Sequence, residues 1–201
     1  MNARPGIQPE RTAVIAIDFQ REIVGANGAF APMFHAELQR TGTIATARTV
    51  LHRARSLGMK IVYSCGAFKP GYPELVANIP VLAMVAQYQC LIEGAEGTAI
   101  VAEMAPREGD LVLTHPRVSG FHGTALDTIL RGAGIDTIML MGVATNLAIE
   151  STARAGSDLG YRTIIVSDAC STVSAAAHDA SLKSLEMLAE VIKSDDIMNM
   201  I

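Results

Sequence analysis

Six short apolar runs recur along the chain, and they are rich in β-branched residues. Because polar and apolar positions do not alternate within them, the runs predict strands buried on both faces, as in a parallel sheet. The predicted strands are TAVIAI (12–17), KIVYS (60–64), DLVLT (110–114), DTIMLM (136–141), RTIIVS (162–167) and EVIK (190–193).

Helical periodicity fills most of the intervals between these strands. In residues 43–57 the apolar positions repeat on one helical face, and Gly58 ends the pattern. Similar patterns predict helices over 125–131, 147–158 and 175–189. The apolar positions of the first helix are Ile44, Ala47, Val50, Leu51 and Ala54.

The alternation of strand and helix predicts a single α/β domain over residues 1–201. Its expected architecture is a three-layer α/β/α sandwich with a six-stranded parallel sheet, doubly wound as in Rossmann-like folds. Residues 21–42 and 66–98 fall outside the alternation and are long for connections. Such excursions usually carry binding or oligomer contacts.

Composition narrows the class of partner. Half of the 201 residues are hydrophobic, and no apolar run approaches the ~20 residues that span a bilayer. The net charge of −4, with only 16 Lys plus Arg, disfavours a nucleic-acid surface. These features predict a soluble protein with a small-molecule partner, no membrane partner and no nucleic acid. The opening residues MNARPGIQPERT do not form a secretory signal, so we expect a cytoplasmic location.

Cysteine usage and motif content bear on cofactors. Cys65, Cys90 and Cys170 are odd in number and widely spaced, which predicts buried, reduced thiols. Neither a phosphate-binding glycine loop nor metal-ligand spacing of His, Cys and carboxylate residues occurs. We therefore expect neither a metal nor another cofactor.

Two ionisable residues stand where strands of the predicted sheet end. Ligands of open parallel sheets bind beyond the carboxyl ends of the strands. Asp18 directly follows the first predicted strand, and His115 follows the third. Each has two interpretations: Asp18 is a catalytic carboxylate or the cap of a loop, and His115 is its catalytic partner or a structural histidine.

Other polar residues near these ends carry weaker signals. Arg117 either binds an anionic substrate or fixes a loop carbonyl, and His122 fits a structural role better than a catalytic one. The segment GVATN leads from the fourth strand into a helix, and backbone N–H groups at such a turn can stabilise an oxyanion. Asn146 either caps that helix or binds substrate.

Four stretches together resemble the isochorismatase-like hydrolase superfamily, also called the cysteine hydrolase family. The similarity spans most of residues 12 to 195. The stretches are VIAIDFQ (14–20), IVYSCGAFKPGYPE (61–74), LTHPRVSGFHGTALDTILRGAGIDTIMLMGVATN (113–146) and ESTARAGSDLGYRTIIVSDA (150–169).

The resemblance implies a homodimer or homotetramer that hydrolyses a small substrate, often an amide or ureide. Amidases of the superfamily use an aspartate, a lysine and a cysteine. The aspartate matches Asp18, but the lysine position holds His115 and the cysteine position holds Ala148. The lysine pattern K-P-R-x-S-x-F otherwise matches at Arg117, Ser119 and Phe121.

The resemblance also implies features of the turn after the fourth strand. These are a cis peptide between Val143 and Ala144, and an oxyanion hole formed by the N–H groups of Ala144 and Ala148. Members that cleave the vinyl ether of isochorismate lack the cysteine, and the resemblance implies that they rely on the aspartate as general acid. Residues 14–20, 61–74 and 113–146 supply the candidate substrate-binding residues, which are Gln20, Phe68, Arg117, Phe121 and Asn146.

Ala148 excludes a covalent thioester route, because a methyl group cannot attack a substrate. The leading hypothesis is an Asp-dependent, thiol-independent hydrolase or lyase of a small polar molecule, in which Asp18 and His115 move a proton and water attacks. One alternative is a catalytically inactive binding protein, and another is a cysteine amidohydrolase whose nucleophile was substituted, although that leaves His115 unexplained. A further alternative gives the nucleophilic role to Cys65.

Overall fold

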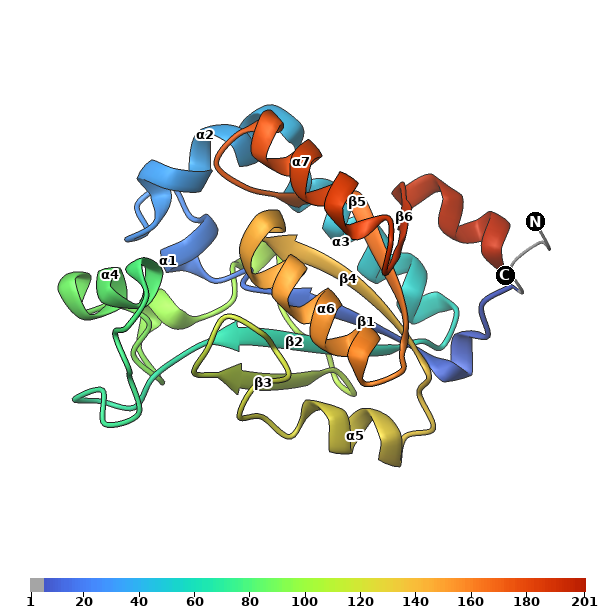
Figure 1. Cartoon of the computed structure of the whole chain (residues 1–201), viewed down its shortest axis with the longest axis horizontal. Coiled ribbons are helices and arrows are strands. Elements are labelled where there is room, and N and C mark those ends of the chain that lie inside the picture. Colours follow the sequence, from blue (N-terminus) through green and yellow to red (C-terminus); the bar gives the residue numbers. More distant parts are fainter. Residues whose placement is uncertain (1–5) are drawn as a thin grey trace.

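One sheet of six parallel strands forms the centre of the computed structural model, which describes residues 6–201 (Figure 1). The strand order is β3-β2-β1-β4-β5-β6, so the predicted doubly wound α/β sheet is confirmed. The strands are β1 (Thr12–Ile17), β2 (Lys60–Gly66), β3 (Leu111–His115), β4 (Thr137–Val143), β5 (Arg162–Ser171) and β6 (Glu190–Ile192).

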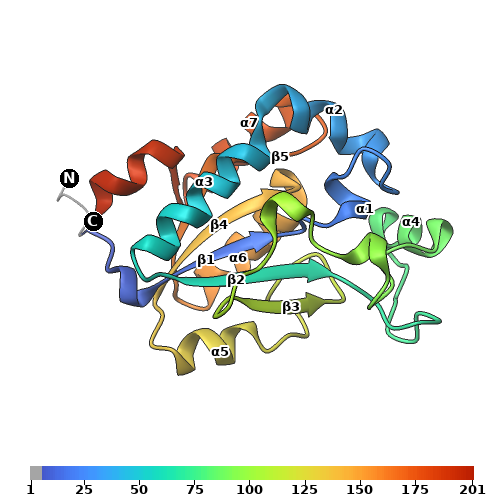
Figure 2. The same ribbon diagram turned by 180° about the vertical axis from the view of Figure 1, so that it is seen from behind.

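Helices form a layer on each side of this sheet. Helix α6 lies in front of the sheet in Figure 1, and α3 lies in front of it in the opposite view of Figure 2. The α-helices are α1 (Arg21–Val24), α2 (Ala31–Thr41), α3 (Thr43–Ser56), α4 (Pro80–Tyr88), α5 (Leu126–Gly132), α6 (Glu150–Asp158) and α7 (Ala175–Leu185). A π-helical turn (Thr145–Ile149) precedes α6, and short 3-10 helices occupy Pro9–Arg11, Glu96–Thr98, Ala102–Met104 and Ser194–Met200.

The strand order reverses between β1 and β4, and every residue of β1 pairs with a residue of β4. Every residue of both strands is buried, as their unbroken apolar sequences predict. Gly142 has a φ of +138°, and a Cβ at this position would lie 2.0 Å from the carbonyl oxygen of Ile17. Only glycine fits this close approach of two backbones at the switch point.

The two outer strands depart from the prediction of burial on both faces. Val112 and Thr114 of β3 are exposed, and all three residues of β6 are half-buried. Both strands lie at sheet edges, where the helical layers cover less of the sheet than at β1 and β4.

The two long excursions contain helices that were not predicted, because Gly and Pro residues interrupt the helical pattern in these parts of the sequence. Residues 21–42 form α1 and α2, and residues 66–98 contain α4. Both views place α1 and α4 beyond the carboxyl ends of the central strands (Figures 1 and 2). The excursions therefore lie where the fold is expected to bind ligands.

Several element boundaries also differ from the prediction. The strand β4 runs two residues beyond Met141, the helix predicted over 147–158 begins with the π-helical turn at Thr145, and α7 ends at Leu185. Among the described residues, all three cysteines are buried and free, as predicted, and no helix is both long and apolar enough to cross a bilayer. Residues 1–5 of the predicted domain lie outside the described part.

We predict that Gly142→Ala lowers the free energy of unfolding by more than about 2 kcal/mol, because the new methyl group clashes with Ile17 and the backbone is strained. Gly160→Ala is the matched control. Gly160 also has a positive φ, of +85°, but a Cβ added there would point into open space, so a cost of about 1 kcal/mol is expected. Equal denaturant midpoints for the two variants would contradict the steric argument.

Candidate active site

Asp18 follows β1 at the centre of the sheet. Its φ of +60° is unusual for a residue with a side chain, and strain of this kind concentrates at functional sites. Its backbone N–H donates to the carbonyl of Ser64 at 2.9 Å, and its Oδ1 accepts from the N–H of Gly66 at 2.9 Å. The residue is 8% exposed. Asp18 thus bonds to the last residue of β2, a strand end and not the loop that one interpretation expected, and it also meets a second ionisable group.

That group is His115, the last residue of β3. The imidazole Nε2 lies 3.0 Å from Asp18 Oδ1, and Nδ1 lies 2.5 Å from the carbonyl oxygen of Arg117. His115 is 4% exposed. The sheet therefore brings together two residues that are 97 positions apart in the chain, with β2 between their strands.

Hydrogen-bond chemistry determines how many protons this pair holds. A carbonyl oxygen only accepts, so Nδ1 of His115 carries a hydrogen and donates it to Arg117. If the ring were neutral, a bare Nε2 would then face Asp18 Oδ1, so a further proton must lie between these two atoms.

The position of that proton follows from the surroundings of His115. Burial opposes a charge on the ring, but the Asp18 carboxylate, its hydrogen bond and the carbonyl of Arg117 outweigh burial and raise the pKa of His115 above its ordinary value. The raised pKa favours the form in which the shared proton lies on the ring, and we call the Asp18–His115 contact the ionic pair.

The turn after β4 lies across the switch point from Asp18. The peptide bond between Val143 and Ala144 is cis, as the resemblance implied. The carbonyl of Ala144 accepts from the N–H groups of Leu147 and Ile149, which begins the π-helical turn. Ala144 and Ala148 are 5% and 3% exposed. The amino-terminal end of this helical segment has the positive polarity that favours an anion.

A cavity of about 70 Å³ brings these parts together. Asp18, His115, Ala144 and Ala148 all line it. The two excursions supply an apolar wall that includes the predicted residue Phe68. The other members of this wall, which the sequence did not single out, are Ile23, Phe30, Phe34, Val81, Leu82, Val85 and Leu91. Apart from the ionic pair, Arg117 is the single charged residue among the described lining residues.

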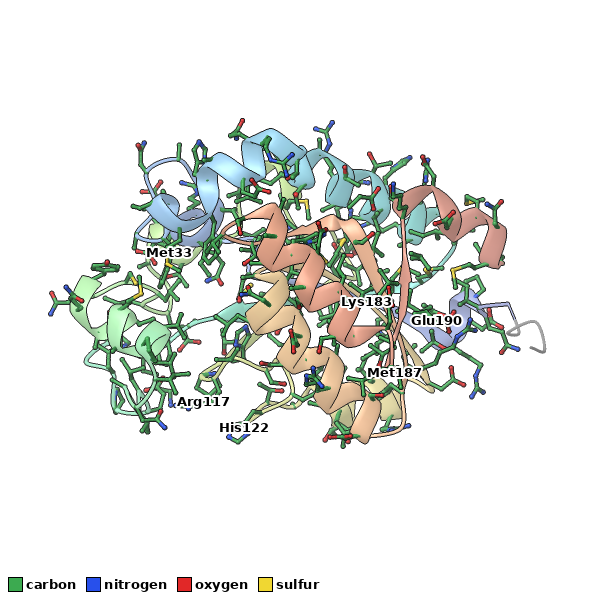
Figure 3. All side chains as sticks on the ribbon, turned by 45° about the horizontal axis from the view of Figure 1, so that its top comes forward. Met33, Arg117, His122, Lys183, Met187 and Glu190 are labelled. Atoms are coloured by element: carbon green, nitrogen blue, oxygen red, sulfur yellow. The ribbon has the colours of Figure 1, made fainter. Side chains whose placement is uncertain are left out.

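Arg117 reaches the cavity, but its guanidinium group is engaged elsewhere. It donates to the carbonyl of Val76 and to Asn78 Oδ1, both at 3.0 Å. The interpretation in which Arg117 fixes a loop carbonyl is therefore the one that the structure supports. His122 is exposed and projects from the edge of the molecule (Figure 3), away from the cavity.

Three predicted substrate-binding residues do not line the cavity. Gln20 is buried and donates to the carbonyls of Gly66 and Thr98, each at 2.9 Å. Phe121 stacks on the ring of Tyr161, with centroids 5.7 Å apart. These two side chains stabilise the structure around the site, whereas Phe68, the other aromatic candidate, does line the cavity.

Asn146 is the third residue outside the cavity. The N-cap position of the helical segment is held by Ala144, so the predicted capping role of Asn146 is wrong. The helical segment begins at Thr145, so Asn146 lies inside it, and its exposed side chain accepts a hydrogen bond of 2.6 Å from Thr172.

Cys65 is unsuited to replace the absent nucleophile. It is buried and does not line the cavity. Burial and the negative charge of Asp18 raise the pKa of its thiol well above the ordinary value, so the reactive thiolate is suppressed. Among residues 6–201, no group of three or more His, Cys, Asp or Glu side chains could hold a metal ion.

Comparison with known proteins identifies the family and supports the fold. Residues 12–196 match the sequence profile described as the isochorismatase domain. An isochorismatase family protein from Desulfovibrio vulgaris has a similar fold, with a TM-score of 0.85 and 23% identity over 94% of this chain and 97% of its own.

Two other solved structures are similar at higher identity. A cysteine hydrolase from Pseudomonas syringae has a TM-score of 0.82 and 27% identity, covering 99% of this chain and 97% of its own. N-carbamoylsarcosine amidase from Thermoplasma acidophilum has a TM-score of 0.74 and 28% identity, covering 92% of this chain and 97% of its own.

We predict that the ionic pair makes stability depend on pH. Because folding raises the pKa of His115 above the ordinary value of 6.5, the stabilisation is complete below pH 6.5 and is lost as the pH rises through the raised pKa. The thermal midpoint of the wild type should therefore exceed that of His115→Gln by more at pH 6 than at pH 9. His122→Gln is the control on an exposed histidine, and a wild-type advantage over His115→Gln that stays constant with pH would contradict the ionic pair.

Proposed function

Because the chain belongs to the isochorismatase family of hydrolases, we propose that it hydrolyses a small molecule in the cavity by a route that requires Asp18 and no thiol. One observation carries the proposal. A buried Asp18–His115 pair, 3.0 Å apart, lines the same cavity as Ala148, which stands where the resemblance implies a cysteine. The site thus retains acid–base groups without a side-chain nucleophile.

The two oxygens of Asp18 have different surroundings. Oδ1 receives the N–H of Gly66 and the proton shared with His115, whereas Oδ2 makes no hydrogen bond with the described residues. In the proposed route Oδ2 removes a proton from water, and the water oxygen bonds to the acyl carbon of the substrate. The electron pair of the C=O bond moves to its oxygen, near the N–H groups of Ala144 and Ala148.

Collapse of this intermediate completes the hydrolysis. The electron pair returns to re-form the C=O bond, and the bond to the leaving group breaks. The leaving group takes the proton that Asp18 had removed from water, so the products are an acid and an alcohol or amine. His115 acts as a positioning residue, because its Nε2 holds Asp18 Oδ1 through the shared proton and its Nδ1 bond to Arg117 fixes the ring.

The lining indicates the substrate class. The ionic pair is neutral overall, the guanidinium of Arg117 is already bonded to Val76 and Asn78, and the remaining wall is apolar. We therefore narrow the predicted small polar molecule to a compact, uncharged compound with one ester or amide group on an apolar body. The similarity to an amidase supports acyl hydrolysis as the reaction class. A homodimer or homotetramer in the cytoplasm remains part of the proposal.

We predict that Asp18→Asn lowers kcat/KM at least about 100-fold, because it removes the general base while keeping the side-chain shape. The probes are a panel of small neutral esters and amides, beginning with p-nitrophenyl acetate and acetamide. Cys65→Ala should retain wild-type turnover, which tests independence from thiols. Equal activity of Asp18→Asn and wild type would refute the route.

The same panel separates the alternatives. A wild type that is stabilised by a panel compound without consuming it would indicate a binding protein. Ammonia release from amides by Ala148→Cys alone, with an inactive wild type, would indicate an amidohydrolase whose nucleophile was substituted. Either result contradicts the proposed function.

A further inference from the structure

We infer that residues Thr172 to Ser181 position the turn that carries Ala144 and Ala148, and that His178 is the principal positioning residue. The inference rests on the proposed function, because it assigns a role in that reaction to the turn. These residues follow β5 and enter α7, and none of them lines the cavity.

His178 holds the first residue of the π-helical turn. Its Nδ1 lies 2.8 Å from the hydroxyl of Thr145, which is fully buried. Burial lowers the pKa of His178 against the opposing charges of Asp179 and Glu37, so a neutral ring makes this contact at neutral pH. The bond joins α7 to the residue that directly follows Ala144.

Two hydroxyl groups provide further contacts on the same turn. The Ser181 hydroxyl lies 3.2 Å from the carbonyl of Thr145 and 2.7 Å from Glu150 Oε2, so its one proton is shared between two acceptors. The Thr172 hydroxyl donates to Asn146 Oδ1 at 2.6 Å. Thr172 and Ser181 are buried, whereas their partners Asn146 and Glu150 are exposed and half-buried, so the buried hydroxyl groups hold side chains that lie nearer the surface.

The side chains of Ala144 and Ala148 cannot hold the turn in place, so contacts from other residues must do so. Ala144 and Ala148 have no polar side chain, so their contribution to the reaction comes from backbone N–H groups alone. A π-helical turn is also a rare local geometry, commonly found at functional sites. His178 and Ser181 hold Thr145 at the start of this turn, and Thr172 holds Asn146 beside it. Ser181 also holds Glu150, the residue directly after the turn, so the segment between these contacts is fixed together with its N–H groups.

The test compares Thr145→Val and His178→Ala with the wild type on p-nitrophenyl acetate. Both variants should lower kcat about 10- to 100-fold while KM changes less than about threefold, because the oxyanion contacts form mainly in the transition state. The double variant should be no slower than either single variant, because both changes break one contact. Thr145→Ser keeps the hydroxyl and should restore kcat.

Ser184→Ala is the matched control, since Ser184 lies on the same helix and accepts from Arg154 without touching the turn. Amide hydrogen exchange of residues 144–149 provides a readout that does not need turnover. Exchange at least about tenfold faster in Thr145→Val and His178→Ala than in Ser184→Ala is expected.

The outcomes distinguish the two proposals. If Asp18→Asn is inactive but His178→Ala matches Ser184→Ala in kcat and in exchange, the positioning role is overturned and the proposed function stands. If the wild type turns over no probe, the exchange measurement decides the positioning role by itself. Unchanged exchange would then refute it.

Discussion

One shared proton organises the site. It lies between His115 Nε2 and Asp18 Oδ1, and the donor bond from Nδ1 to Arg117 makes it obligatory. The contact joins the ends of β1 and β3 across β2, so the ionic pair also connects three strands at the edge of the sheet where the cavity lies. The proposed acid–base chemistry and the connection between the three strands therefore depend on the same few atoms of Asp18 and His115.

Much of the fold could be predicted, because strands that are buried on both faces of the sheet have uninterrupted apolar sequences. All six strands follow from uninterrupted apolar runs, and the placement of Asp18 and His115 follows from the rule that strand ends meet at one sheet edge. The edge strand β3 has the same apolar character as β1, yet one of its faces is open. Local sequence does not record which strand lies outermost.

The site was less predictable where a side chain could either line the cavity or bond to the surrounding structure. Gln20 and Phe121 lie close in sequence to cavity residues, but neither side chain enters the cavity. Gln20 donates to two backbone carbonyls, and the ring of Phe121 stacks on Tyr161. The position of Asn146 within its helix depends on where the π-helical turn begins, and the amino-acid sequence does not indicate a π-helical turn at this place. The wall formed by Phe30 and Leu91 requires two distant excursions to fold over one strand end.

The close approach of Gly142 to Ile17 lies apart from the contacts of the ionic pair. The turn after β4 is held by this glycine and by side chains of Thr172 to Ser181, whereas His115 bonds to Asp18 and to the carbonyl of Arg117. The backbone donors of the turn and the acid–base pair thus have separate supports, although they line one cavity. A substitution at position 115 that weakens the pair would leave the supports of the turn in place.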